Sequence, residues 1–120
     1  MNAVMIHDSN RFEFQYATKC IKYDRHGYRP RERILLIGDK SVFLLDGKSY
    51  KQKHRIPINK IPKVLVTQER DGLMLIRIPL ELKKDKGDLI LDIPEVIECS
   101  VWFLEAAGRK ELIEVIDSAS

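Results

Sequence analysis

The stretch IKYDRHGYRPRERILLI, residues 21–37, contains two β-like segments separated by a turn. Gly27 allows backbone angles that other residues avoid, and Pro30 cannot donate a hydrogen bond to a strand ladder. The residues around them are therefore expected to form the loop of a hairpin. Basic side chains crowd this hairpin, since six basic and two acidic residues lie between Lys19 and Arg33. The stretch thus predicts the start of an antiparallel sheet and raises the question of what its cations bind.

Alternation of apolar and polar residues extends from this hairpin through most of the chain before Pro94. Turn signals such as Asp46-Gly47 separate the segments, and the loop ELKKDKGD (81–88) is polar. Such a series of short strands favours a small antiparallel barrel or sandwich. The seven expected strands are RFEFQY (11–16, continuing toward Tyr23), RERILLI (31–37), SVFLL (41–45), HRIPI (54–58), KVLVTQ (63–68), LMLIRI (73–78) and LILDI (89–93).

The period changes at PEVIECSVWFLEAAG, residues 94–108, which predicts an amphipathic helix over the barrel. Proline is tolerated at the first helical position, and Gly108 stands where a left-handed cap is common. The segment KELIEVIDSAS (110–120) suits either a helical turn or a strand, and we leave it open. The apolar residues expected to share the packed face of the helix are Ile97, Val101 and Leu104, with Val96, Phe103 and Ala107 beside them.

The length of 120 residues, with 44% hydrophobic and 32% charged residues, suits one domain with its own core. We expect a single domain over residues 1–120, with 1–11 as a flexible lead-in and 108–120 as a C-terminal extension of unassigned structure. No apolar run approaches the roughly 18 residues of a membrane-spanning helix. The first residues lack the pattern of a signal peptide, so we expect a cytosolic protein.

Charge is distributed unevenly along the chain. The formal net charge is only +3, but residues 48–63 contain six basic and no acidic residues. Residues 91–120 carry a net charge of −5. A field concentrated in this way attracts an anionic partner that the net charge alone would not indicate.

The residue types that support catalysis or metal binding are sparse. Cys20 and Cys99 are expected to be reduced, partly buried thiols. The three histidines, His7, His26 and His54, are far apart, and their surroundings do not predict a zinc site. There is no glycine-rich phosphate loop and no nucleophilic triad pattern. We therefore expect a binding module without a cofactor rather than an enzyme.

The strand prediction places the hairpin cations in space. Arg31 and Arg33 share one face of their strand with the apolar residues that follow, and Lys22 lies across the hairpin from them. If that face lines the barrel interior, these three cations converge at its mouth and repel one another unless an anion is bound, which suggests a phosphate site. The alternative is a solvated hairpin paired weakly with Asp24, Glu32 or the acidic helix.

The spacing of tyrosine, glycine and proline in YDRHGYRPR, residues 23–31, resembles the opening of the tail homology 1 domain of class I myosins. The similarity continues through KHRIPINKIPKVLVTQERDGLMLIRI (53–78), KGDLILDI (86–93) and the following helix, and covers residues 14–107. It implies a pleckstrin-homology-like fold, a seven-stranded antiparallel barrel with a C-terminal helix. It also implies binding of anionic phospholipids, in particular phosphoinositides such as phosphatidylinositol bisphosphate.

The resemblance also implies roles for individual residues. Lys22, at the end of the first strand, and Arg33, in the second, match the family's head-group contacts, and Arg31 completes the basic-x-arginine pattern. His26 departs from the family, because a lysine or arginine is expected there. The supporting basic or membrane-facing residues are expected to be Arg25, Tyr28, Arg29, Lys51, Lys53 and Arg55.

The expected function is that of a membrane-targeting tail that anchors an actin-based motor to the inner face of the plasma membrane or to endosomes, at the cell cortex. The sequence contains neither a motor nor a calmodulin-binding neck, so actin-activated ATPase activity and the partners actin and calmodulin are assigned to the parent protein. We expect the domain to be monomeric.

Two other binding classes compete with this interpretation. A protein-interaction module would bind cargo or an adaptor along the helix or a strand edge, and Trp102 would contribute if it is exposed rather than in the core. A nucleic-acid-binding barrel would need stacked aromatics, but Tyr23, Tyr28 and Tyr50 are not spaced as one platform. We therefore predict no nucleic-acid partner.

Overall fold

The computed structural model describes residues 14–67, 72–83 and 87–116. Its strands form one eight-stranded sheet in the order β4-β3-β2-β1-β7-β6-β5-β8. The helical elements are η1 (Ile58–Lys60), α1 (Leu80–Lys83), α2 (Val96–Ala107) and η2 (Lys110–Leu112). The strands are β1 (Phe14–Tyr23), β2 (Pro30–Gly38), β3 (Ser41–Asp46), β4 (Gln52–Pro57), β5 (Val64–Thr67), β6 (Leu73–Ile76), β7 (Leu89–Asp92) and β8 (Ile113–Ile116).

The mainly β fold with one long helix near the C-terminus is confirmed, and all seven predicted strands are present. The segment left open in the sequence supplies the eighth strand, β8, which pairs in parallel with β5. The other pairings among the described residues are antiparallel. The predicted polar loop at 81–88 includes part of the short helix α1. The predictions for residues 1–13, 68–71, 84–86 and 117–120 lie outside the described residues.

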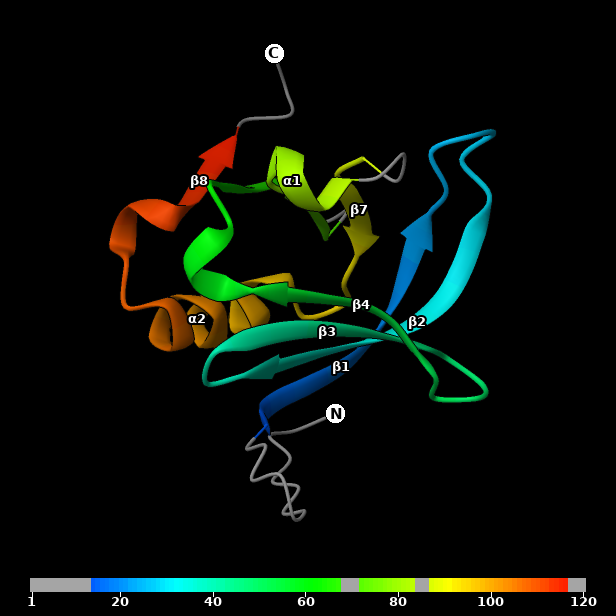
Figure 1. Ribbon diagram of the computed structural model, residues 1–120, viewed down its shortest axis with the longest axis horizontal. Helices are drawn as coiled ribbons and strands as arrows, with labels where there is room; N and C mark the ends of the chain where they lie inside the picture. Colours follow the sequence, from blue (N-terminus) through cyan, green and yellow to red (C-terminus); the bar gives the residue numbers. More distant parts are fainter. Residues whose placement is uncertain (1–13, 68–71, 84–86, 117–120) are drawn as a thin grey trace.

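Strand β1 connects the two halves of the sheet. It pairs with β2 along its length, and its last residues, Ile21–Tyr23, also pair with β7. Figure 1 shows the hairpin formed by β1 and β2 projecting at the right, while α2 and β8 lie on the left. The loop of this hairpin has φ of 77° at Gly27, as its glycine predicts. The basic hairpin therefore lies on the opposite side of the molecule from α2 and β8.

The core lies between the inner face of the sheet and α2. Tyr16 is fully buried, and its ring stacks on Trp102 with centroids 6.0 Å apart and an angle of 20° between the planes. Trp102 is consequently half-buried and belongs to the packing around the core rather than to an open surface. Other fully buried side chains are Leu35, Ile37, Leu44, Ile61, Met74, Ile76, Leu89, Leu91, Ile93, Phe103 and Leu112.

Helix α2 buries a different face from the predicted one. Its buried residues are Val96, Cys99 and Phe103, whereas Ile97 is 72% exposed and Val101 is 55% exposed. The prediction that Ile97 and Val101 share the packed face is wrong. Apolar residues occupy most positions of this helix, so several faces satisfy a helical period, and the contact with the sheet selects one of them.

The ends of α2 agree only in part with the prediction. The helix begins at Val96 with Glu95 as its N-terminal cap residue, so Pro94 precedes the helix instead of opening it. At the other end Gly108 has φ of 66°, and its N–H donates to the carbonyl of Leu104 at 2.9 Å. The left-handed cap is therefore confirmed.

The packed face of α2 can be tested by two substitutions. Phe103→Ala should lower the free energy of unfolding by about 3–5 kcal/mol, because it leaves a cavity in the core. Ile97→Ala should change it by less than about 0.5 kcal/mol, because that side chain is already in water. Urea unfolding followed by circular dichroism measures both values. Similar losses at the two positions would contradict the observed orientation of the helix.

Candidate functional site

The register of the first hairpin brings the three predicted head-group residues onto one face. Lys22 lies directly opposite Arg31, and Arg33 follows two residues later on the same side of β2. Leu35 and Ile37 continue this face and are fully buried in the core. The side chain of Arg33 is only 14% exposed, whereas that of Arg31 is about half-exposed. The cations thus follow the inner face of the sheet outward, with Arg33 deepest.

A cavity of about 300 Å³ opens beside these residues. It is lined by four cations, two histidines and one carboxylate, and the cations come from β1, β2, β4 and the loop after β1. Such a lining is suited to an anion with several negative charges. The lining residues are Lys22, Asp24, Arg25, His26, Arg33, Lys53 and His54.

An irregularity in β4 explains how two consecutive residues reach this cavity. Leu44 pairs with His54 and Leu45 pairs with Gln52, so Lys53 is an extra residue without a partner in the ladder. In a regular strand the side chains of Lys53 and His54 would point to opposite faces of the sheet. A β-bulge can redirect the extra side chain, and both residues line the cavity beside this irregularity.

Arg31 and the remaining predicted residues do not line this cavity. The guanidinium of Arg55 lies over the ring of Phe43 on the other face of the sheet, 5.7 Å from the ring centroid. Lys51 lies in the turn before β4, and its N–H donates to the hydroxyl of Ser49 at 3.3 Å. Tyr28 and Arg29 are exposed in the loop between β1 and β2.

Asp24 neutralises part of the cluster. Its Oδ2 accepts a hydrogen bond from Nε of Arg31 at 2.9 Å, and its Oδ1 lies 3.5 Å from Nζ of Lys22. The hydrogen bond from Arg31, with the charges of both cations, holds the pKa of this carboxyl below its ordinary value. Two of the three predicted head-group residues therefore share one carboxylate, which occupies their donors in the place of an external anion.

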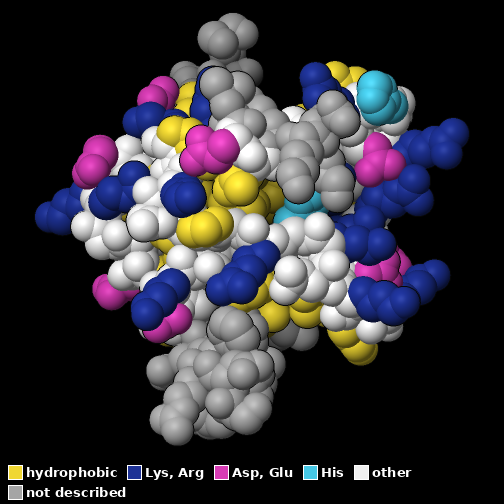
Figure 2. All heavy atoms as spheres, in the orientation of Figure 1, with side chains coloured by type: hydrophobic (Ala, Val, Ile, Leu, Met, Phe, Trp, Pro, Cys, Tyr) yellow, Lys and Arg dark blue, Asp and Glu magenta, His cyan; other side chains and the backbone are white. Residues whose placement is uncertain are grey.

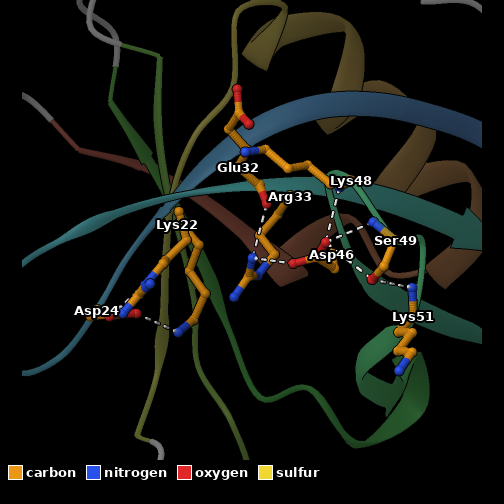
Figure 3. A network of polar contacts seen from close by, with 9 residues as sticks. Lys22, Asp24, Glu32, Arg33, Asp46, Lys48, Ser49 and Lys51 are labelled. Carbon is orange, nitrogen blue, oxygen red and sulfur yellow. Dashed lines mark hydrogen bonds and ion pairs between the residues drawn. The ribbon is translucent and has the colours of Figure 1, made fainter.

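Asp46 holds Arg33 and also closes the turn between β3 and β4, as Figure 3 shows. Its Oδ1 is 3.2 Å from Nη1 of Arg33, which also donates to the carbonyl of Glu32 at 2.9 Å. Its Oδ2 accepts the N–H groups of Lys48 and Ser49 at 3.0 and 2.8 Å. These backbone donors, more than Arg33, lower the pKa of Asp46 to about 2.

Arg33 keeps unused hydrogen-bonding capacity. Its Nε is buried and has no hydrogen-bond partner in the described part of the chain. A buried donor without a partner costs free energy, and a bound oxyanion would satisfy it. Because Asp46 and the Glu32 carbonyl fix Nη1, the guanidinium is already positioned before any anion binds.

A larger cavity of about 370 Å³ also borders Arg33, but its lining suits an anion less well. Its charged residues are two cations, Lys19 and Arg33, and two carboxylates, Glu32 and Asp92. The side chain of Glu32 points away from that of Arg33 (Figure 3). With balanced charges and several apolar lining residues, this cavity offers no excess of donors for a phosphate group.

The surface view shows where basic side chains gather. Figure 2, in the orientation of Figure 1, shows Lys and Arg side chains gathered along the right-hand edge, where the hairpin of β1 and β2 lies.

Among the described residues, no three His, Cys, Asp or Glu side chains are grouped so that they could hold a metal ion. None of the helices that the structure describes is long and apolar enough to cross a bilayer.

Three features of this site were not predicted from the sequence. Asp46 is recognisable in the sequence only as a turn residue, and its contact with Arg33 requires the pairing of β2 with β3. His54 carried no signal, because the bulge that places Lys53 beside it leaves no mark in the residue pattern. His26 was noted only as a departure from the family.

Solved structures show the fold class. The hSac2 domain from the human phosphoinositide phosphatase Sac2 superposes with a TM-score of 0.61 at 10% identity, covering 91% of this chain and 79% of that chain. The DH/PH domains of p115-RhoGEF superpose with a TM-score of 0.62 at 12% identity, covering 84% of this chain and 32% of that chain. The chain therefore has a pleckstrin-homology-like fold.

The sequence comparisons show the family. A family model described as unconventional myosin tail, actin- and lipid-binding, matches residues 1–118. Unconventional myosin IC of Drosophila melanogaster is 49% identical over 108 residues, which cover 90% of this chain and 10% of that protein. Unconventional myosin-Ic of Bos taurus is 37% identical over 101 residues, which cover 84% of this chain and 9% of that protein. This chain belongs to the tail homology 1 domains of the class I unconventional myosins.

The family defines the domain as a binding module of a myosin tail rather than a catalytic domain. The chain spans about a tenth of the length of the relatives it matches. The family description names actin together with lipid as a partner of the tail itself. From the sequence, actin was expected as a partner of the parent protein, whereas the family description attributes actin binding to the tail.

The role of Asp46 predicts a pH-dependent stability. Because its pKa falls from the ordinary 3.8 to about 2 on folding, the ionised carboxylate stabilises the fold above about pH 4, and this stabilisation is lost as the pH falls toward 2. Asp46→Asn should therefore lower the melting temperature at pH 7, and the difference from the unchanged protein should shrink between pH 4 and pH 2.

Melting curves recorded by circular dichroism across this range provide the measurement. Asp39→Asn, which removes an exposed carboxylate from the turn between β2 and β3, is the control and should shift the melting temperature little. If the melting temperature of Asp46→Asn lies below that of the unchanged protein by the same amount at every pH, the ionised carboxylate has no such role.

Proposed function

We propose that this tail domain binds the head group of a phosphoinositide, such as phosphatidylinositol bisphosphate, in the cavity between the first hairpin and β4. One observation carries the proposal: four cations, Lys22, Arg25, Arg33 and Lys53, line one cavity that contains a single carboxylate. The lipid-binding description of the family agrees with it. The volume of about 300 Å³ is at the lower end of the usual range for small-molecule sites.

The binding follows from the charges and their positions. The basic edge is attracted to the anionic leaflet, where each nearby Lys or Arg contributes about 1 kcal/mol within a Debye length. Arg33, held by Asp46, donates its free Nε and remaining N–H groups to a phosphate oxygen. Lys22 and Arg31 exchange the Asp24 carboxylate for the more highly charged phosphate.

In the parent protein this contact would hold the actin-based motor at a membrane. We propose the inner face of the plasma membrane or endosomes at the cell cortex as the location, with the domain acting as a monomer. Calmodulin is a partner proposed for the parent protein outside these residues.

The decisive experiment removes the two deepest cations. Lys22→Gln/Arg33→Gln should weaken binding to phosphatidylcholine vesicles containing phosphatidylinositol bisphosphate by about 100-fold, because two charge-assisted contacts of about 1.5 kcal/mol each are lost. Glutamine retains much of each side-chain stem, so packing is largely preserved. Co-sedimentation at physiological salt measures the affinity, and the melting temperature of the variant verifies its fold.

The matched control removes the same charge from exposed positions near α2. Lys60→Gln/Lys110→Gln alters η1 and η2, away from the cavity, and should weaken binding by no more than about threefold. Equal losses of vesicle affinity in the two double variants would show that a diffuse basic surface, rather than a head-group site, binds the membrane. A folded domain that does not bind these vesicles at all would overturn the proposal.

Asp24 provides a gain-of-function test. Asp24→Asn removes the carboxylate that occupies Lys22 and Arg31 in the absence of ligand, and the affinity for the same vesicles should rise about fivefold, because one negative charge is removed beside the bound anion. Asp39→Asn changes the net charge equally in another turn and serves as the control. Unchanged or weaker binding by Asp24→Asn would show that this carboxylate does not compete with the lipid.

A protein-interaction role is favoured by one specific observation. The outer face of α2 exposes Ile97 and Val101 together with Glu98 and Glu105, and it lies on the side opposite the basic hairpin (Figure 1). If the head-group site alone binds vesicles, Ile97→Ser/Val101→Ser should bind them normally. If instead this variant loses an actin or adaptor contact while it retains lipid binding, the domain has two separate binding faces.

A further inference from the structure

Two tyrosines stand in the turns of the two hairpins that border the basic cavity. Tyr28 lies between β1 and β2, and Tyr50 lies between β3 and β4. They are 66% and 64% exposed, the most exposed aromatic side chains that the structure describes. Their φ angles are 48° and 63°, and among the described residues no other non-glycine residue has a positive φ.

The fold of the domain does not account for tyrosine at these positions. The left-handed region of backbone space favours glycine and asparagine, and a bulky side chain is disfavoured there. A ring that remains in water contributes little hydrophobic stabilisation. Both tyrosines therefore occupy positions where packing gains little and the backbone conformation disfavours them.

The two turns have a common orientation relative to the cavity. The strands that lead into them supply Lys22, Arg33 and Lys53 to its lining. Figure 1 shows both turns at the right-hand edge of the molecule, with α2 and β8 on the left. Figure 2 shows Lys and Arg side chains along the same edge. A flat surface that touches both turns would therefore face the basic side of the molecule.

Resting on the proposed function, we infer that Tyr28 and Tyr50 are paired interfacial anchors that enter the head-group layer of an anionic bilayer on either side of the cavity. Tyrosine suits this layer because its ring is apolar and its hydroxyl remains hydrogen-bonded to water or lipid. The exposed cations Arg29, Lys48 and Lys51 lie within two residues of one of the tyrosines in sequence and would lie at the depth of the lipid phosphates. Together with the head-group site, the two turns give three separated contacts, which fix the tilt of the domain on the membrane; one head-group site cannot do so.

The native thiols allow a direct test of depth. Cys20 and Cys99 are free and buried, and burial raises the pKa of both thiols, that of Cys20 to about 12, so neither should react with a maleimide in the folded domain. Tyr28→Cys, Tyr50→Cys and the control Ile97→Cys can each be labelled with an environment-sensitive nitrobenzoxadiazole dye. Each labelled protein is then mixed with phosphatidylcholine vesicles, with and without phosphatidylinositol bisphosphate.

The expected result is a blue-shifted, stronger emission at positions 28 and 50 that requires the phosphoinositide, with quenching by bromine-labelled lipids. The label at position 97 should not change, because α2 lies on the far side from the two turns. A response at position 28 without one at position 50, or an equal response at 97, would overturn the two-point contact.

A second set of variants separates membrane contact from folding. Tyr28→Asn and Tyr50→Asn place a residue that tolerates positive φ in each turn, so the melting temperature should stay the same or rise. Each variant should nevertheless bind vesicles about fivefold more weakly, while Tyr28→Trp and Tyr50→Trp retain binding. Unchanged affinity of the asparagine variants would show that the rings contribute nothing.

The outcomes distinguish this inference from the proposed function. If the domain binds phosphoinositide vesicles but the emission of the dye at positions 28 and 50 does not change, the inference that the two tyrosines are membrane anchors is wrong, while the proposed head-group site is unaffected. If the folded domain does not bind the vesicles, the proposed function fails and the inference fails with it. If the asparagine variants lose a protein contact but keep full vesicle affinity, the two turns form a protein-binding surface instead.

Discussion

The double pairing of β1 is the constraint on which the rest of the structure depends. Residues Ile21–Tyr23 are hydrogen-bonded to β2 on one side and to β7 on the other, so the two halves of the sheet meet there. Lys22 lies at the centre of this short segment. Its backbone position is therefore fixed by pairing on both sides, and the cavity beside it is built where the two halves of the sheet meet.

Two carboxylates make a concentration of positive charge compatible with a folded, ligand-free domain. Asp24 binds Lys22 and Arg31, and Asp46 binds Arg33. Their roles differ, because Asp46 is held by two backbone N–H groups of its own turn, whereas Asp24 is held mainly by the cations themselves. An incoming phosphate would compete with Asp24 for its cations, while Asp46 remains part of the scaffold that positions Arg33.

The helix illustrates where periodicity is insufficient. The residues of α2 are apolar on more than one face, so the spacing of Ile97 and Val101 fits a packed face as well as that of Val96, Cys99 and Phe103. The stacking of Trp102 on Tyr16, and the burial of Phe103 against the sheet, select one rotation of the helix. No pattern within the helix contains that information, because it depends on the shape of the surface on which the helix packs.

The sequence by itself determined the seven strands, the turn at Gly27, the cap at Gly108 and the common face of Lys22, Arg31 and Arg33. These features depend on alternation and on local backbone preferences, which act between residues close along the chain. Tertiary structure alone decided the parallel pairing of β8 with β5 and the contact of Asp46 with Arg33. It also decided the irregularity in β4, beside which Lys53 and His54 line one cavity. These features join segments that are distant in sequence, and their geometry follows from strand register and packing rather than from any local pattern.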